Sequence, residues 1–91
     1  MMALAAQPSR GLWALRGDLE YTAEDFDAAL AAFGRATEME PGFGRGYLMM
    51  GYCAVELGDE GAARGYLTQA AGFVEQRAAA ESLLAGLSSA R

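Results

Sequence analysis

Hydrophobic residues recur every three or four positions along most of the chain, which is the spacing of one face of an α-helix. The clearest stripe lies within residues 25–39 and consists of Phe26, Ala29, Leu30, Phe33 and Ala36. No segment alternates between apolar and polar residues in the way that a half-buried β-strand does. The pattern therefore predicts an all-α fold.

Five helices are predicted from this periodicity and from the residues that begin and end helices. They span about residues 10–22, 25–39, 44–57, 60–73 and 75–88. Ser9 and Asp59 each precede a helix, and their side chains can accept a hydrogen bond from a free amide of its first turn. Gly58 suits the left-handed conformation that often ends a helix. Thr22 and Asp25 have the spacing of a capping box, with Asp in place of the usual Glu.

A second regularity is a longer repeat, which has a period of about 34 residues. It relates three pairs of small residues, which are Gly17 and Gly51, Ala29 and Ala63, and Ala36 and Ala70. Glycine inside a helix costs about 1 kcal/mol relative to alanine, so Gly17 is best explained by a neighbouring helix that approaches closely. A repeat of this length corresponds to one helix–turn–helix unit.

The segment from Trp13 to Pro41 resembles a tetratricopeptide repeat unit. It keeps six positions of the family pattern, namely Trp13, Gly17, Ala29, Phe33, Ala36 and Pro41. It departs at Arg16 and Glu20, where the family usually has Leu and Tyr. The resemblance implies a right-handed superhelical stack of two tetratricopeptide-like helix pairs and a C-terminal capping helix. We expect a leader at 1–8 and a single domain at 9–91, with repeats at about 10–42 and 43–74 and the capping helix at about 75–88.

The family resemblance also implies a function. In such proteins the first helix of each pair lines a concave surface that binds a segment of another protein. We therefore expect a non-catalytic adaptor with a partly apolar peptide-binding groove. The residues implied to contact the peptide are Asp18, Tyr21, Arg45, Leu48, Met49, Tyr52, Val55 and Glu56. An alternative for Leu48, Met49 and Val55 is that they pack on the N-terminal segment or on a second copy of the chain.

Two other functions stay open at this point. The run from Arg45 to Leu87 looks like the end of small tetratricopeptide chaperones of type III secretion, which hold apolar segments of exported proteins. In addition, two helix pairs are fewer than the roughly three that usually make a stable stack. Apolar surface near Leu12 and Leu15 would then be exposed unless a homodimer covered it, which predicts a self-associating structural protein.

Charge and composition exclude several classes of partner. The chain has 91 residues, 53% of them hydrophobic, so we expect a small globular domain rather than a disordered tail. Seven basic and twelve acidic residues give a net charge of −5. Nucleic-acid binding needs a basic patch, and only Arg10, Arg16 and Arg45 could form a small basic edge. We therefore expect no nucleic-acid partner, and the acidic surface and lack of a long apolar run argue against a membrane.

Catalysis has little support in the sequence. Histidine is absent, which excludes histidine-based triads, general bases and metal ligands. Cys53 is predicted to be a small buried hydrophobic residue rather than a reactive thiol. Glu38 and Glu40 diverge on a helix and are expected to be solvated. We predict no enzyme activity, no catalytic residues, no cofactor and no metal, and a cytoplasmic location because a single cysteine forms no internal disulfide.

Overall fold

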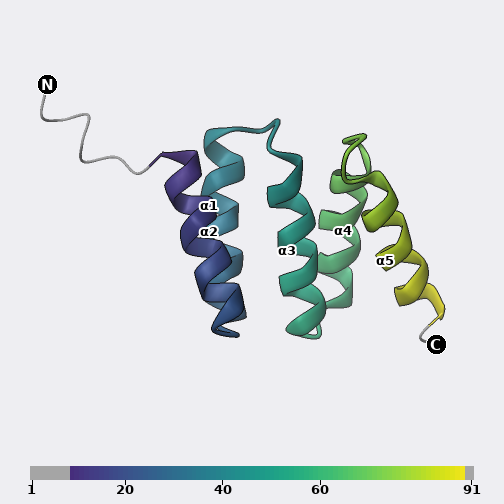
Figure 1. The fold of residues 1–91 in the computed structure, drawn as a ribbon. Coiled ribbons are helices and arrows are strands. Elements are labelled where there is room, and N and C mark those ends of the chain that lie inside the picture. The colour runs from purple at the N-terminus through teal and green to yellow at the C-terminus, as the bar shows by residue number, and fades with distance from the viewer. Residues whose placement is uncertain (1–8, 90–91) are drawn as a thin grey trace, which may run out of the picture.

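The computed structural model describes residues 9–89, and the expected leader at 1–8 lies outside them. The described residues form five helices and no strand, which confirms the all-α prediction. The helices are α1 (Arg10–Thr22), α2 (Phe26–Met39), α3 (Gly44–Glu56), α4 (Glu60–Ala71) and α5 (Arg77–Ser89). They stand side by side along the stack, α1 and α2 forming one antiparallel pair and α3 and α4 the next (Figure 1). α2 packs on α3, and α5 packs on α4.

The two helix pairs are structural repeats of each other. The first and last residues of α3 lie 34 positions after those of α1, and the first residue of α4 lies 34 positions after that of α2. Asp25 and Asp59 stand at equivalent positions, and each side chain accepts a hydrogen bond from the amide three positions later, at 3.3 and 3.1 Å. Ser9 caps α1 in the same way. The predicted caps at Ser9 and Asp59 are therefore confirmed, whereas the right-handed superhelix stays a prediction.

Three details of the predicted helix ends differ in the structure. Thr22 does not begin a capping box, because it is the last residue of α1 and its hydroxyl donates to a carbonyl one turn earlier, at 3.0 Å. Asp25 alone is the N-cap of α2. The fourth helix ends at Ala71, earlier than predicted, and the fifth begins at Arg77, later than predicted, because the chain turns through residues 72–76.

The helices of each pair cross at a glycine. A Cβ atom on Gly17 would lie 2.7 Å from the ring of Phe33, and one on Gly51 would lie 2.7 Å from Cγ of Leu67. Phe33 and Leu67 have no exposed surface, so neither has room to move aside. The expected close approach at Gly17 is confirmed. The alanines at the other repeat positions, Ala29, Ala36, Ala63 and Ala70, are also fully buried.

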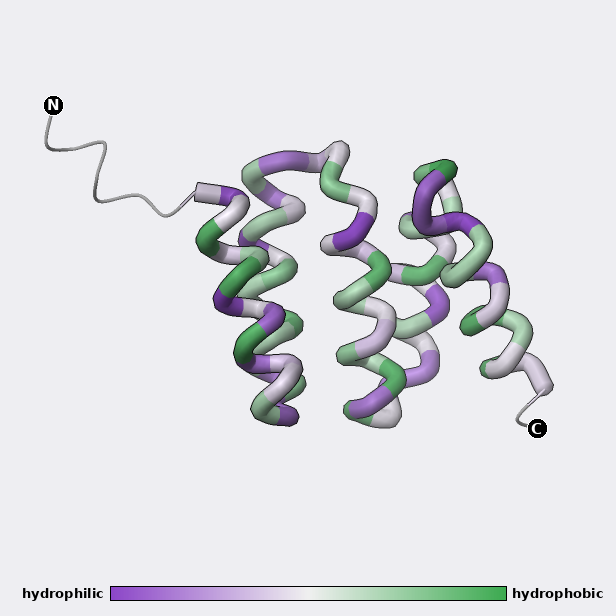
Figure 2. Tube along the Cα trace, in the orientation of Figure 1, coloured by the Kyte–Doolittle hydropathy of each residue, from purple (hydrophilic) through white to green (hydrophobic). Residues whose placement is uncertain are grey.

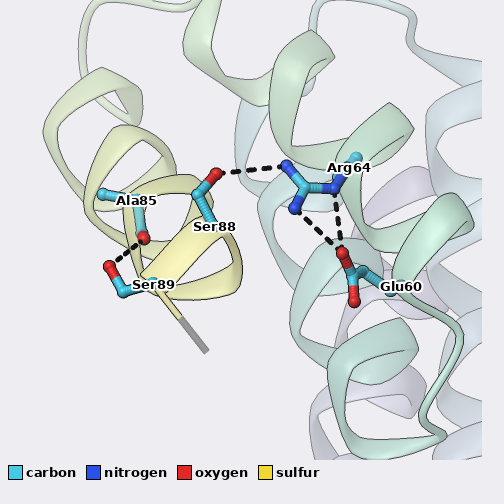
Figure 3. Close-up of polar contacts among 5 residues, drawn as sticks. All are labelled: Glu60, Arg64, Ala85, Ser88 and Ser89. Carbon is cyan, nitrogen blue, oxygen red and sulfur yellow. Dashed lines mark hydrogen bonds and ion pairs between the residues drawn. The ribbon is translucent and has the colours of Figure 1, made fainter. Parts of the chain in front are cut away.

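α5 closes the second helix pair. Three of its leucines pack against the core that Ala63 and Leu67 form, namely Leu83, Leu84 and Leu87. Arg64 adds a polar connection, because it donates to Glu60 at 2.9 Å within α4 and to the hydroxyl of Ser88 on α5 at 3.5 Å (Figure 3). The sequence correctly predicts a helix that packs on the last pair.

Candidate functional site

Asp18 and Arg45, both predicted to contact a peptide, bind each other. The Arg45 guanidinium donates to both carboxylate oxygens of Asp18, at 3.0 and 3.1 Å. The same guanidinium lies over the rings of Phe33 and Phe43, 5.7 and 5.6 Å from their centroids. Both charged side chains are about two-fifths exposed. The pair therefore connects α1 to α3, and each charge already has a partner within the chain.

Tyr21 and Tyr52 form an aromatic surface across α1 and α3. Their ring centroids are 6.4 Å apart in an edge-to-face arrangement, and Tyr21 meets Phe26 in the same way at 5.3 Å. Both tyrosines are half-buried. Within residues 9–89 neither hydroxyl makes a hydrogen bond. The structure thus brings two predicted site residues together with their polar ends available.

The three apolar candidates pack mainly on the chain's own helices. Leu48 and Val55 lie against the core cluster of Ala54, Ala63 and Leu67, and Met49 lies against the cluster built around Phe33. All three are half-buried. Much of their apolar surface is therefore covered by intramolecular packing, and the remainder is available to a partner.

The predicted residues do not line one continuous hollow. A pocket of about 410 Å³ lies where the α1–α2 turn meets the end of α3, and we name it the turn pocket. It is lined by Tyr21, Thr22, Glu24, Phe26 and Glu56. A second hollow of about 380 Å³ lies between the α2–α3 turn and the α4–α5 turn. Its lining includes Arg45. Tyr21 and Glu56 line the turn pocket instead.

Sequence reasoning missed Glu24 and Phe26 as site residues. Glu24 is the one non-glycine residue with a positive φ among the described residues, at 63°. The equivalent position of the second repeat is Gly58, with φ 77°. A glutamate in a place where the repeat otherwise has glycine is the sequence signal that could have identified it.

Burial and nearby negative charge raise the pKa values of two side chains, Tyr21 and Cys53. Burial, followed by the negative charge of Glu56, raises the pKa of Tyr21. Burial raises the pKa of the Cys53 thiol to about 11. Cys53 has no exposed surface, which confirms that it is a small buried residue.

The arginines of the expected basic edge each have an acidic partner. Arg10 lies 3.2 Å from Glu40, Arg16 lies 3.2 Å from Glu20, and Arg45 is held by Asp18. Residues 9–89 contain no group of three or more side chains suited to hold a metal ion. In the same part of the chain, every helix is too short or too polar to cross a membrane.

Comparison with known families gives one match. The family model described as tetratricopeptide repeat matches residues 20–87. This region includes α2, α3 and α4 in full and most of α5. No curated protein and no solved structure matches the chain.

Proposed function

Because the family match spans most of its residues, this chain belongs to the tetratricopeptide repeat family, and we propose that it is a non-catalytic module that binds a peptide segment of a partner protein. Repeats of this family generally mediate interactions between proteins. The observation that supports this proposal is the Tyr21–Tyr52 pair, whose half-buried rings lie on the first helices of the two repeats. Tyrosine contributes large apolar area and a hydroxyl at low conformational cost.

In this proposal the segment lies across α1 and α3. The rings of Tyr21 and Tyr52 bury its apolar side chains, and the exposed parts of Met49 and Val55 extend that contact along α3. The two tyrosine hydroxyls supply hydrogen bonds to the segment's backbone. Because the Asp18 carboxylate is already neutralised by an arginine, it orients the segment through remaining lone pairs rather than as a free charge.

The proposal is tested by selecting peptides from a random display library with the full chain and measuring their affinity by calorimetry. Tyr52→Ala should weaken the binding of a selected peptide by roughly 1–3 kcal/mol, the usual range for an interface anchor. Gln69→Ala, on the exposed side of α4, is the matched control and should leave affinity unchanged. If Tyr52→Ala binds the selected peptide as tightly as Gln69→Ala does, Tyr52 does not belong to the site. Failure to select any peptide would count against the peptide-binding function.

One further observation favours self-association as a second candidate. Leu12, Leu15 and Leu19 are 58%, 54% and 63% exposed on α1. The residues equivalent to Leu12 and Leu19 in the second repeat are Gly46 and Cys53, which are both buried. Figure 2 shows hydrophobic segments recurring along α1 between hydrophilic ones. In the second repeat this face is covered by the first helix pair, and in the first repeat a second copy of the chain would cover it.

Sedimentation velocity separates this candidate from the peptide-binding module. Self-association predicts that the sedimentation coefficient rises with concentration up to about 100 µM. Leu15→Gln combined with Leu19→Gln should abolish the rise, because it removes two of the three exposed leucines of α1. A monomer throughout that range would contradict self-association.

The secretion-chaperone alternative and the cytoplasmic location stay predictions of the sequence. Co-purification of the chain with an aggregation-prone exported protein would support the chaperone. Its absence in cells that carry a secretion apparatus would count against it.

A further inference from the structure

The turn pocket combines aromatic rings with two carboxylates that lack a basic partner. Tyr21 and Phe26 line it, and the Tyr52 ring lies against Tyr21. Neither Glu24 nor Glu56 forms an ion pair within residues 9–89. The arginines within residues 9–89 all have other partners, namely Arg10, Arg16, Arg35, Arg45, Arg64 and Arg77. The pocket therefore combines two aromatic rings with two negatively charged carboxylates.

The helix ends around the pocket add to its negative potential. α1 ends at Thr22 and α3 ends at Glu56, and the C-terminus of a helix carries a partial negative charge. Basic residues in the last turn would compensate for that charge, but neither helix has one there. A carboxylate at the end of α3 is thus placed where the local field disfavours it.

These features belong to the first repeat alone. The residues equivalent to Tyr21, Glu24 and Phe26 in the second repeat are Val55, Gly58 and Glu60. Gly58 makes the same left-handed turn without a side chain, so the fold of the turn does not require a glutamate. The left-handed conformation is unfavourable for a residue with a Cβ atom. Tyr21 and Phe26 also pack against the core cluster around Phe33, so formation of the repeat leaves only Glu24 without a structural explanation.

We propose that the turn pocket binds an arginine or lysine side chain of the partner segment, with the cation held between the ring of Tyr21 or Phe26 and the carboxylates of Glu24 and Glu56. This inference rests on the proposed function and specifies the chemistry of the bound segment. Aromatic faces attract guanidinium and ammonium groups, and more strongly in a partly desolvated site. Calcium needs six or more oxygen ligands, whereas only two carboxylates line this pocket, so an organic cation fits better than a metal ion.

The test uses the full chain and a small probe, N-acetyl-arginine N-methylamide, with the citrulline derivative as its uncharged counterpart. We expect saturable shifts of the backbone amide resonances of residues 21–26 and 56 with the arginine probe and none with citrulline. The double variant Glu24→Gln with Glu56→Gln should lower the affinity for the arginine probe roughly three- to tenfold, the range for two partly exposed charge contacts. Glu75→Gln with Glu81→Gln gives a control of equal net charge, and it should bind the probe like the unmodified chain.

Three outcomes would overturn the inference. They are equal shifts with arginine and citrulline, no shifts with either, and equal loss of affinity in both double variants. The same double variants then separate this inference from the proposed function. If display-selected peptides bind the Glu24/Glu56 variant at full affinity and still require Tyr52, the peptide-binding module stands and the cation site is wrong. If no peptide is selected but the arginine probe binds at residues 21–26, the pocket stands and the peptide groove is wrong.

Discussion

Substituting alanine for Gly17 tests whether the first helix pair depends on close approach. The new Cβ atom would meet three atoms of the Phe33 ring at 2.7–2.9 Å. Such distances essentially never occur between non-bonded carbon atoms, so either the ring or α1 must move. The ring has no exposed surface and is rigid, so we expect an overpacking cost near the upper end of the usual range, about 3 kcal/mol.

The gain in helix propensity opposes that cost. Replacing glycine by alanine inside a helix stabilises it by about 1 kcal/mol, which leaves a net destabilisation of about 2 kcal/mol for Gly17→Ala. Gly65 provides the matched control, because it lies within α4 and nothing would stand within 4 Å of its Cβ atom. Gly65→Ala should therefore stabilise the chain by about 1 kcal/mol. The same chemical change is expected to have opposite signs at the two positions.

Urea denaturation followed by circular dichroism at 222 nm measures both free energies of unfolding. Adding Phe33→Leu to the Gly17→Ala variant opens space beside the new methyl group. The two changes should then be non-additive by at least about 0.5 kcal/mol, as expected for residues in contact. If Gly17→Ala stabilises the chain as much as Gly65→Ala does, or if its effect adds to that of Phe33→Leu, the reasoning from close approach is wrong.

Two further predictions concern the turn pocket and the buried thiol. Glu24→Gly should raise the free energy of unfolding by about 1 kcal/mol in urea denaturation, because glycine removes the strain of a left-handed φ. The same substitution should reduce binding of the arginine probe. A lower free energy of unfolding would contradict the strain argument. Cys53 has its pKa raised to about 11, so the folded state keeps a proton that the unfolded state releases above about pH 9. The free energy of unfolding should therefore fall between about pH 9 and pH 11 more steeply in the unmodified chain than in Cys53→Ala, and parallel pH profiles would contradict this.

Much of the fold could be predicted because its determinants are local or repeat at a fixed interval. The N-caps depend on side chains a few residues from the amides that they bind, and Gly17 marks a helix crossing. The end of the fourth helix was less predictable, since Glu75 stands where the family usually has proline. The turn is held by backbone hydrogen bonds and by a tertiary contact, in which the Phe73 ring stacks on Tyr47 with centroids 5.9 Å apart. No local pattern encodes that contact.

The candidate site was harder to predict because it depends on which charges meet across helices. The family resemblance implies that Asp18 and Arg45 lie on the proposed groove side, but it does not reveal that they neutralise each other. Periodicity identifies Leu19 as apolar without showing whether another helix covers it. The equivalent residue, Cys53, is fully buried, whereas Leu19 is 63% exposed, because only α3 has a helix pair packed on that side.

Comparison of the two repeats also indicates where function lies. Positions with the same role in both units, such as Gly17 and Gly51, are explained by packing of the helix pair. Positions with different residues in the same backbone conformation are not explained in that way. Glu24 has the left-handed turn that glycine makes in the second repeat, so its charge is extra to what the fold needs. A side chain that the fold does not require, placed beside aromatic rings in a pocket, is the best candidate for contact with another molecule.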